Sequence, residues 1–485
     1  MSLTFKVQPQ ELMPVYNPLI IVATSSQQTQ LNYQLVSSIY CRGSLITKLK
    51  TPVNPEGYMV VDLHKHLENK ISFDFNPTLT GINIATQSFA TYSVTFADEF
   101  RQNWAFVDNS FTVIGSTGYA GFVGAAGGPE PYFKVGDEIY VNQTVPYTNA
   151  SYNGLHNILS ITYSAGVWKI VTDAEWGAST GAEPGTITYA NFGLTTLSST
   201  YSISTKYAFN GVRSFLDFPS WNYDDWDANT STYGKFFTNV PDNYELDVDG
   251  LMFLNMYQNS ANEIRTIKVR TNNGTYSITN SYSAMTTPQQ RFLQANLSPS
   301  YFYSQGWIDD FSFVNGKATV DIWVNNNSGL QTIATKSFVI TKNCSKYEKM
   351  QLVFMDKMGS FLSYTFNMVN RNNKTINRTD YQQYYGSYAP ASQNWTYNSY
   401  DRGRKTLDIV VVESYTLNSD WVNQSTADYL FELFESPEVY LVKEDGTIIA
   451  INITVAPPER KQTINEQIFN YTITFELSNK NNSQK

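Results

Sequence analysis

The chain is poor in the residues on which most enzyme chemistry depends. It holds three histidines and two cysteines among 485 residues, and 15% of its residues are charged, against about 25% in an average protein. Zinc hydrolases, thiol enzymes and enzymes with histidine acid–base catalysis all need residues that are scarce here. We therefore expect no catalytic residues, no cofactor and no bound metal.

Disulfide frameworks, basic clusters and long apolar runs are missing as well. Cys41 and Cys344 lie far apart in the sequence, so we expect two reduced, structural thiols. A net charge of −9 without clustered lysine and arginine argues against a nucleic-acid partner. No run approaches the roughly 18 apolar residues that span a bilayer, and the first residues do not resemble a secretory signal. We therefore expect neither membrane association nor export.

Aromatic and small polar residues take the place of the missing charge. The chain has 34 Tyr and 29 Phe, together with many Asn, Ser and Thr residues. Aromatic and β-branched side chains fit the pleated, half-buried surface of a sheet. The composition predicts a mainly β protein: β-sandwich domains, an inserted small β-barrel and a C-terminal β-module that carries one helix.

Strand and turn patterns divide the chain into four predicted segments. Residues 1–101 form an N-terminal β-sandwich, in which residues 31–41 alternate between apolar and polar. Residues 102–196 are an inserted small β-barrel, because short strands recur there at intervals of about 8–12 residues. Residues 197–345 return to long alternating strands and form a second sandwich or complete the first.

Residues 346–485 are predicted to form a distinct C-terminal module. The stretch 406–412 predicts a buried strand, because it contains the strand-sized apolar run Ile409–Val412. A helix is expected at 425–436, capped by Ser425 and stopped before Pro437. Its apolar stripe consists of four residues at helical spacing: Ala427, Leu430, Phe431 and Phe434.

Two groups of side chains resemble metal ligands. His64 and His66 would share one face of a strand, but no cysteine or third histidine nearby completes a tetrahedral site. Asp225, Asp227 and Asn229 match the first three ligand positions of a calcium loop, but the glycine and glutamate that such a loop needs further on are absent. We interpret both groups as polar edges and turns, and a structural calcium ion stays open.

One aromatic–carboxylate group resembles a sugar-processing site. Asp309 and Asp310 follow Trp307 directly. Glycosidases need two carboxyl groups about 5–9.5 Å apart across a cleft, whereas adjacent residues of a strand point to opposite faces. We therefore interpret the pair as a solvated strand edge.

The most distinctive segment is an aromatic loop at residues 381–400. Tyrosine and tryptophan supply large contact areas at low entropic cost, and the Ser, Asn and Gly residues between them add adaptable hydrogen bonds. Loops of this length are usually functional or disordered, and the aromatic content argues against disorder. We predict a protein–protein contact, with packing over its own module as the alternative. The interface candidates are Tyr384, Tyr385, Tyr388, Trp395, Tyr397 and Tyr400.

Several stretches together resemble a known group of proteins. Residues 15–23 (VYNPLIIVA), 55–69 (PEGYMVVDLHKHLEN) and 92–100 (YSVTFADEF) resemble a virion-protein domain of tailed phages that infect Bacteroidetes, including crAss-like phages. The stretches 420–423 (DWVN), 429–441 (YLFELFESPEVYL) and 469–479 (FNYTITFELSN) are similar to the same group. The resemblance covers roughly residues 10–100 and 345–480.

The resemblance implies a non-enzymatic structural subunit of the virion. Such a subunit forms part of a tail, connector ring, hub or baseplate and occurs in several copies. Its expected partners are other copies of itself and other tail or connector proteins. Its expected location is the virion, after assembly in the host cytoplasm.

Two other classes of function remain open from the sequence. A carbohydrate-binding adhesin or receptor-binding protein would present Tyr384 and Trp395 in an exposed groove, where they stack on sugar rings. A polysaccharide-degrading enzyme would have two carboxylates that face each other across a cleft.

Overall fold

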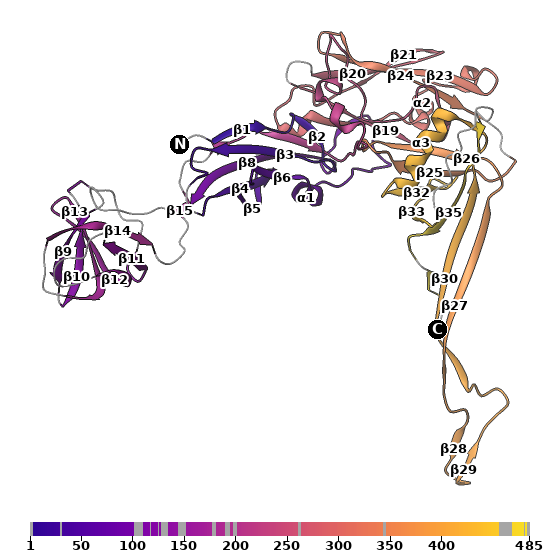
Figure 1. The fold of residues 1–485 in the computed structure, drawn as a ribbon. Helices are drawn as coiled ribbons and strands as arrows, with labels where there is room; N and C mark the ends of the chain where they lie inside the picture. The colour runs from indigo at the N-terminus through magenta and orange to yellow at the C-terminus, as the bar shows by residue number, and fades with distance from the viewer. Residues whose placement is uncertain are drawn as a thin grey trace. The chain divides into compact units, whose positions relative to one another are not determined.

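The protein consists mainly of short strands, as predicted (Figure 1). The computed structural model describes residues 3–29, 32–100, 110–116, 118–124, 126–127, 134–143, 152–176, 181–189, 195–196, 201–259, 263–342, 346–454, 468–479 and 481–482. Across these residues no helix has the length and apolar character needed to cross a membrane. Cys41 is a buried free thiol, whereas Cys344 falls outside the described residues.

The chain folds into two compact units, each built from separate stretches of sequence. The first unit comprises Met1–Pro9, Pro18–His66 and Tyr92–Lys206, and the second comprises Gln10–Asn17, Leu67–Thr91 and Tyr207–Lys485. This division differs from the four consecutive segments predicted from the sequence.

Two small antiparallel sheets open the first unit. Phe5 in one sheet packs on Phe96 in the other, with ring centroids 5.1 Å apart. The predicted alternation within residues 31–41 is confirmed from Gln34 on, because Leu35, Ile39 and Cys41 are buried and their neighbours Val36 and Tyr40 are half-buried. One sheet contains β1 (Leu3–Val7), β3 (Ile20–Ser25) and β6 (Met59–Asp62); the other contains β4 (Gln34–Cys41), β5 (Ser44–Pro52), β8 (Phe89–Phe100), β15 (Thr195–Thr196) and β16 (Tyr201–Ser202). The helix α1 (His64–Leu67) follows β6.

Six strands of the predicted insertion close into a barrel. Their hydrogen-bonded order is β10-β13-β12-β11-β14-β9, and β9 pairs again with β10. Buried Val113, Phe122, Val141, Ile158 and Ile170 fill the interior. The predicted start of the insertion, residue 102, lies outside the described residues, whereas Thr195 and Thr196 at its predicted end pair with β8 and not with a barrel strand. The strands are β9 (Ser110–Ser116), β10 (Tyr119–Val123), β11 (Glu138–Gln143), β12 (Gly154–Ser164), β13 (Val167–Glu175) and β14 (Gly181–Tyr189).

We expect the barrel to be removable. Thr195 pairs with Phe100, and Thr196 with Glu99, so the chain leaves and re-enters the neighbouring sheet at adjacent positions. Joining Arg101 to Phe192 through a short linker should therefore leave a remainder that melts cooperatively, with a far-UV circular dichroism signal typical of β structure. A remainder that loses both properties would show that the barrel is needed for folding.

A five-stranded sheet forms one layer of the second unit. The alternating strands predicted within residues 197–345 are confirmed here, and Ile267, Val269, Val320 and Ile322 point into the core. The order is β18-β24-β23-β20-β21, and β18 runs parallel to β24. The strands are β18 (Tyr244–Asp247), β20 (Ile264–Thr271), β21 (Gly274–Thr279), β23 (Lys317–Asn326) and β24 (Gln331–Thr341).

A larger sheet forms the second layer and joins the two predicted C-terminal segments. Its order is β27-β30-β35-β33-β32-β25-β26-β19-β22-β7, with β36 paired to β30. The boundary predicted at 345/346 therefore separates no domains, because β26 pairs directly with β19. The strands are β7 (Ile82–Ile84), β19 (Met252–Tyr257), β22 (Phe292–Asn296), β25 (Met350–Met355), β26 (Phe361–Phe366), β27 (Arg371–Gln382), β30 (Arg404–Asn418), β32 (Val439–Val442), β33 (Ile448–Ile453), β35 (Thr472–Leu477) and β36 (Asn481–Asn482).

The middle of this sheet is buried on both faces. Leu352 and Phe354 of β25 face the main core, whereas Val353 and Met355 face a second cluster that includes Phe75. Because successive side chains of a strand point to opposite faces, a strand covered on both sides reads as one apolar run. Short elements complete the unit: β2 (Leu12–Pro14), parallel to β17 (Lys206–Phe209), α2 (Pro299–Ser304), and β31 (Val422–Asn423), paired with β34 (Ile468–Phe469).

The predicted C-terminal helix is present as α3 (Gln424–Glu435), but its cap and its buried face differ from the prediction. Asn423, not Ser425, is the N-cap, and its side chain accepts a hydrogen bond from the Thr426 amide. Tyr429 and Leu433 are buried together with Ala427 and Leu430. The predicted Phe431 and Phe434 are half-buried and pack against Tyr471 instead.

This difference in burial sets the expected stability of two variants. Leu433→Ala should lower the free energy of unfolding by about 2–5 kcal/mol, because it leaves a cavity in the core. Phe434→Ala should cost less, since its ring keeps part of its surface in water. Urea denaturation of both variants checks the order, and a larger loss for Phe434→Ala would contradict the observed helix face.

Candidate functional site

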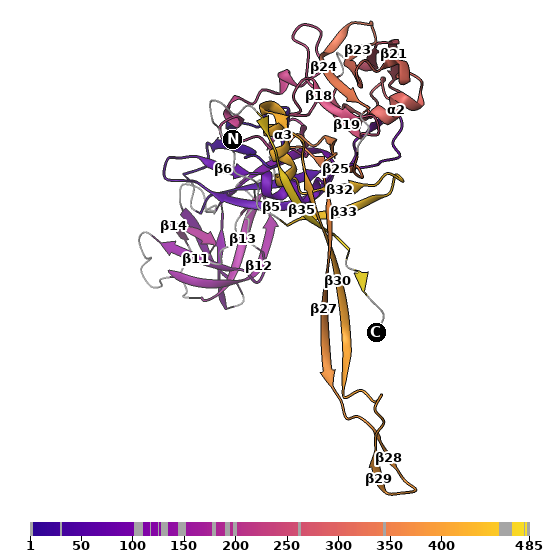
Figure 2. The same ribbon diagram turned by 90° about the vertical axis from the view of Figure 1, so that its right-hand side faces the viewer.

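Two strands of the second unit continue beyond the sheet as a two-stranded ribbon (Figures 1 and 2). β27 and β30 pair from Arg371 opposite Thr416 to Gln382 opposite Arg404. β35 covers only the end of β30, from Ser414 onward. Every residue of β27 is exposed. We call residues 371–413 the arm.

The apolar stretch of the arm is not the buried strand predicted for residues 406–412. Leu407 is 54% exposed, and Ile409 to Val412 are half-buried. The partner strand β27 is almost entirely polar, with Ile376 as its one aliphatic residue. Along this stretch, the pairings of the described residues add only β36, opposite Val410 and Val411. The run therefore has the composition of a buried strand, but among the described residues its side chains stay half-buried or exposed.

The arm ends in a hairpin that presents the six predicted interface residues. β28 (Ser387–Ala389) pairs with β29 (Asn394–Thr396). The six aromatic side chains are between 51% and 95% exposed, so the alternative that they pack over their own module is wrong. The composition of residues 381–400 identified these six residues as candidates, but no sequence pattern indicated that they lie at the end of a two-stranded ribbon. The residues are Tyr384, Tyr385, Tyr388, Trp395, Tyr397 and Tyr400.

Contacts within the tip hold several of these rings in place. The Trp395 indole donates a hydrogen bond to the Tyr385 carbonyl at 2.9 Å. The rings of Tyr385 and Tyr397 meet edge to face at 5.5 Å. Gly386 has φ +91°, and a Cβ there would lie 2.4 Å from the Thr396 carbonyl oxygen, so the turn requires glycine. Ordered rings lose less entropy when they bind a partner.

The two groups that resembled metal ligands are not brought together as sites. His64 Nδ1 lies 2.7 Å from Asp62 Oδ2. Asp225 is exposed, whereas Asp227 is buried, and burial raises the pKa of Asp227 to about 7. Within the described part of the chain, no three His, Cys, Asp or Glu side chains are placed to hold a metal ion. The expectation of a protein without a metal stays a prediction.

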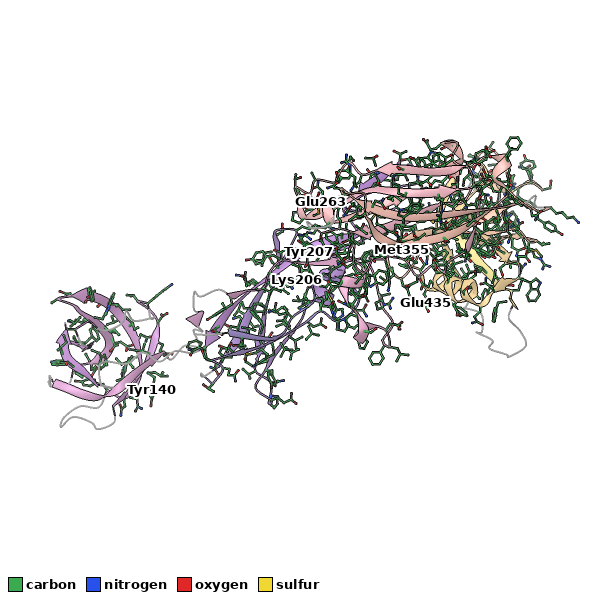
Figure 3. All side chains as sticks on the ribbon, turned by 90° about the horizontal axis from the view of Figure 1, so that it is seen from above. Tyr140, Lys206, Tyr207, Glu263, Met355 and Glu435 are labelled. Atoms are coloured by element: carbon green, nitrogen blue, oxygen red, sulfur yellow. The ribbon has the colours of Figure 1, made fainter. Side chains whose placement is uncertain are left out.

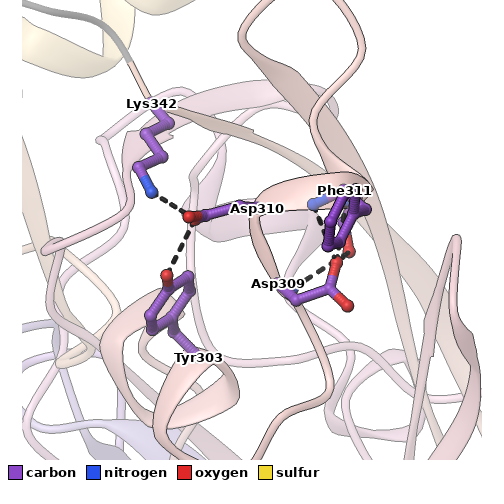
Figure 4. Close-up of polar contacts among 6 residues, drawn as sticks. Tyr303, Asp309, Asp310, Phe311 and Lys342 are labelled. Carbon is purple, nitrogen blue, oxygen red and sulfur yellow. Dashed lines mark hydrogen bonds and ion pairs between the residues drawn. The ribbon is translucent and has the colours of Figure 1, made fainter.

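Asp309 and Asp310 belong to a turn and not to the strand edge expected from the sequence (Figure 4). Asp309 caps the 3-10 helix η6 (Asp310–Ser312) and accepts hydrogen bonds from the Phe311 amide at 3.0 Å and the Ser312 amide at 2.9 Å. Asp310 pairs with Lys342 and accepts a hydrogen bond from the Tyr303 hydroxyl at 2.8 Å. Each carboxylate therefore serves a local structural contact.

One pair of buried carboxyl groups escaped the sequence analysis. Asp356 follows β25 and Glu432 lies on α3, and both line a cleft of about 310 Å³ that also includes Met355 and Glu435, labelled in Figure 3. Burial, followed by the neighbouring Glu432 charge, raises the pKa of Asp356, and burial also raises the pKa of Glu432. The two residues are 76 positions apart, and no sequence pattern links them.

The carboxyl oxygens of Asp356 and Glu432 accept hydrogen bonds from neighbouring residues of the fold. Asp356 accepts hydrogen bonds from the amides of Met358 and Ser360, both at 2.9 Å, and from the Thr238 hydroxyl at 2.5 Å. Glu432 accepts hydrogen bonds from the Lys357 amide and the Asn239 side chain, both at 2.9 Å. This arrangement fixes the turn between β25 and β26, and we interpret it as structural.

The raised pKa of Asp356 predicts a pH-dependent stability. An unfolded aspartate titrates near 4. Because the folded protein binds this proton more tightly, the stabilisation is complete below about pH 4 and is lost as the pH rises through the raised pKa. Asp356→Asn should flatten this decline, since the amide oxygen can still accept both backbone hydrogen bonds. Urea midpoints between pH 4 and pH 9 measure the slope.

Glu435→Gln serves as the control, because Glu435 lines the same cleft but is exposed. It should keep the wild-type slope. If Asp356→Asn also kept that slope, Asp356 would be ionised in the fold throughout.

Comparison with known proteins adds little. No protein-family model and no curated protein match the chain. A solved structure of the SGBP-B protein from the Bacteroides ovatus mixed-linkage glucan utilization locus, in complex with a mixed-linkage heptasaccharide, is 7% identical. The alignment covers 84% of this chain and 92% of that chain, with a TM-score of 0.14. A TM-score this low supports no conclusion about fold or function.

Proposed function

We propose that this protein is a structural subunit of a tailed-phage virion and that it binds its neighbours through the tip of the arm. The observation that carries the proposal is the ribbon that presents six exposed aromatic residues. Tyr and Trp are enriched in the cores of protein interfaces and among the residues that dominate binding energy. The assignment to a virion rests on the sequence resemblance.

The free energy of burying the tip rings favours a bound tip over one left exposed to water. Monomeric proteins seldom expose large contiguous apolar patches without a function. Burying one large side chain contributes about 1.5–3 kcal/mol, so burial of all six tip rings contributes at most about 9–18 kcal/mol, which is of the same order as the association cost of about 4–15 kcal/mol. The hydrogen bond from Trp395 to Tyr385 keeps the rings ordered before binding.

Glycan binding is the second candidate, because the same exposed rings can stack on sugars. A saccharide site also needs polar groups around the ring. Here the indole N–H of Trp395 is already bonded to the Tyr385 carbonyl. This leaves fewer polar groups at the ring and favours a protein partner.

Replacing Tyr384, Tyr385 and Trp395 with Ser should abolish complex formation and leave the fold intact. The three rings make no contact with the core, so the melting temperature should change little. Native mass spectrometry of the chain alone, and co-purification with the other tail and connector proteins of its phage, measure the loss.

The control replaces three exposed rings on other elements, Tyr119, Tyr163 and Phe311, with Ser. This variant should assemble like the wild type. Normal assembly of the tip variant would refute the interface, and glycan-array binding that is lost in the tip variant would favour the adhesin.

A further inference from the structure

The arm differs in charge from the rest of the chain. It contains six cations, namely Arg371, Lys374, Arg378, Arg402, Arg404 and Lys405, and four anions, namely Asp380, Asp401, Asp408 and Glu413. Its net charge is therefore +2, and since the whole chain carries −9, the remaining residues carry −11. Opposite charges on two surfaces steer their association and exclude wrong partners.

Four of the arm's cations are free to bind a partner. Lys374 pairs with Glu413 at 2.8 Å, and Arg404 pairs with Asp380 at 3.0 Å. Arg371, Arg378, Arg402 and Lys405 are exposed and take part in no ion pair among the described residues. Lys405 lies at the end of the ribbon next to the aromatic tip, with Arg402 just beyond the last pair, and Arg378 lies further back, opposite Ile409.

The same charges argue against pairing between two arms. The open edge of β27 is a possible template for another strand. However, β27 carries Arg371, Lys374 and Arg378 against one anion, Asp380, so two such edges would repel each other. Charged residues on an edge strand are a common protection against that pairing. An acidic surface is the better acceptor.

A cleft in the second unit has the matching chemistry. It has a volume of about 280 Å³ and is lined by the acidic Glu245, Asp247 and Asp420 and by Tyr364 and Trp421. Glu245 and Asp247 have lysine partners, Lys317 and Lys349, whereas Asp420 has no ion-pair partner among the described residues.

Trp421 is a second, independent feature of this cleft. Its side chain is 66% exposed beside the Asp420 carboxylate. An indole face attracts a guanidinium or ammonium group, by about 0.5–2 kcal/mol depending on exposure. Carboxylate and indole together fit an arginine or lysine side chain, which the arm of this chain supplies.

We propose that the arm of one copy docks with its basic, aromatic tip in the Asp420–Trp421 cleft of a second copy. This inference rests on the proposed function and names the partner surface. The contact is heterologous, because arm and cleft are different surfaces of each copy. Each copy therefore gives one arm and receives one, and the contact repeats into a ring or a filament.

Two variants separate the donor surface from the acceptor surface. The arm variant carries Arg378→Glu, Arg402→Glu and Lys405→Glu, and the cleft variant carries Asp420→Asn and Trp421→Ala. All five side chains are exposed, so both variants should fold, and far-UV circular dichroism checks this. Trp421→Ala alone replaces the cleft variant if that variant is unfolded. The control carries Lys6→Glu, Lys48→Glu and Lys70→Glu, the same change in charge on exposed lysines outside the arm.

Analytical ultracentrifugation of the full chain gives the result. The wild type and the control should associate at about 50 mM salt. Their dissociation constant for self-association should rise at least about tenfold at about 500 mM salt. Each variant alone should be monomeric. A mixture of the two variants contains one intact arm and one intact cleft, so it should form a 1:1 dimer that does not grow.

Three outcomes would overturn the inference: a wild-type chain that stays monomeric at low salt, an arm variant that associates normally, or a mixture that forms no dimer. A different result would overturn the inference but leave the proposed function standing. In that result the wild type is monomeric on its own but binds another virion protein, and replacement of Tyr384, Tyr385 and Trp395 with Ser abolishes that binding.

Discussion

The turn between β25 and β26 is the contact on which the second unit depends. The Asp356 carboxylate accepts the amides of Met358 and Ser360 and the Thr238 hydroxyl. Gly359 adopts φ +86°, and a Cβ there would lie 2.4 Å from the Asn210 carbonyl oxygen, so the turn also packs directly on a distant segment. A buried carboxyl group is costly unless it is fully hydrogen-bonded. Three donors at one carboxylate meet that condition and fix the strands on both sides of the turn.

One continuous strand, β30, connects the arm to the sheet and sets the register of the arm. β30 begins at the tip with Arg404 and ends in the sheet at Asn418, where β35 fixes its register from Ser414 onward. A shift of one residue would turn every side chain to the other face. Buried Tyr415 and Leu417 prevent that shift, since it would expose them. The core therefore determines which residues the distant ribbon presents on each face.

Local patterns predicted the strands well and their surroundings poorly. The alternation in β4 and β23 gave the correct elements, because burial with period two follows directly from the order of apolar and polar residues. The run 406–412 was predicted as buried, because apolar residues do not reveal whether anything covers them. The helix cap moved from Ser425 to Asn423, a choice between two residues that both cap well. The aromatic loop was found from composition alone, whereas Asp356 and Glu432 meet only through the tertiary fold.

The half-buried apolar run of β30 favours binding of the arm to a partner surface. An isolated two-stranded ribbon is marginally stable in water. The residues of β30 from Ile409 to Val412 favour a strand through their β-branched side chains. They remain half-buried because β27 offers mostly polar partners. A surface that covers this stretch gains about 25 cal/mol of binding free energy for each Å² of apolar area that is buried. Little conformational entropy is lost, because the ribbon is already formed before binding. The same residues that keep the arm extended therefore favour its burial against a neighbour.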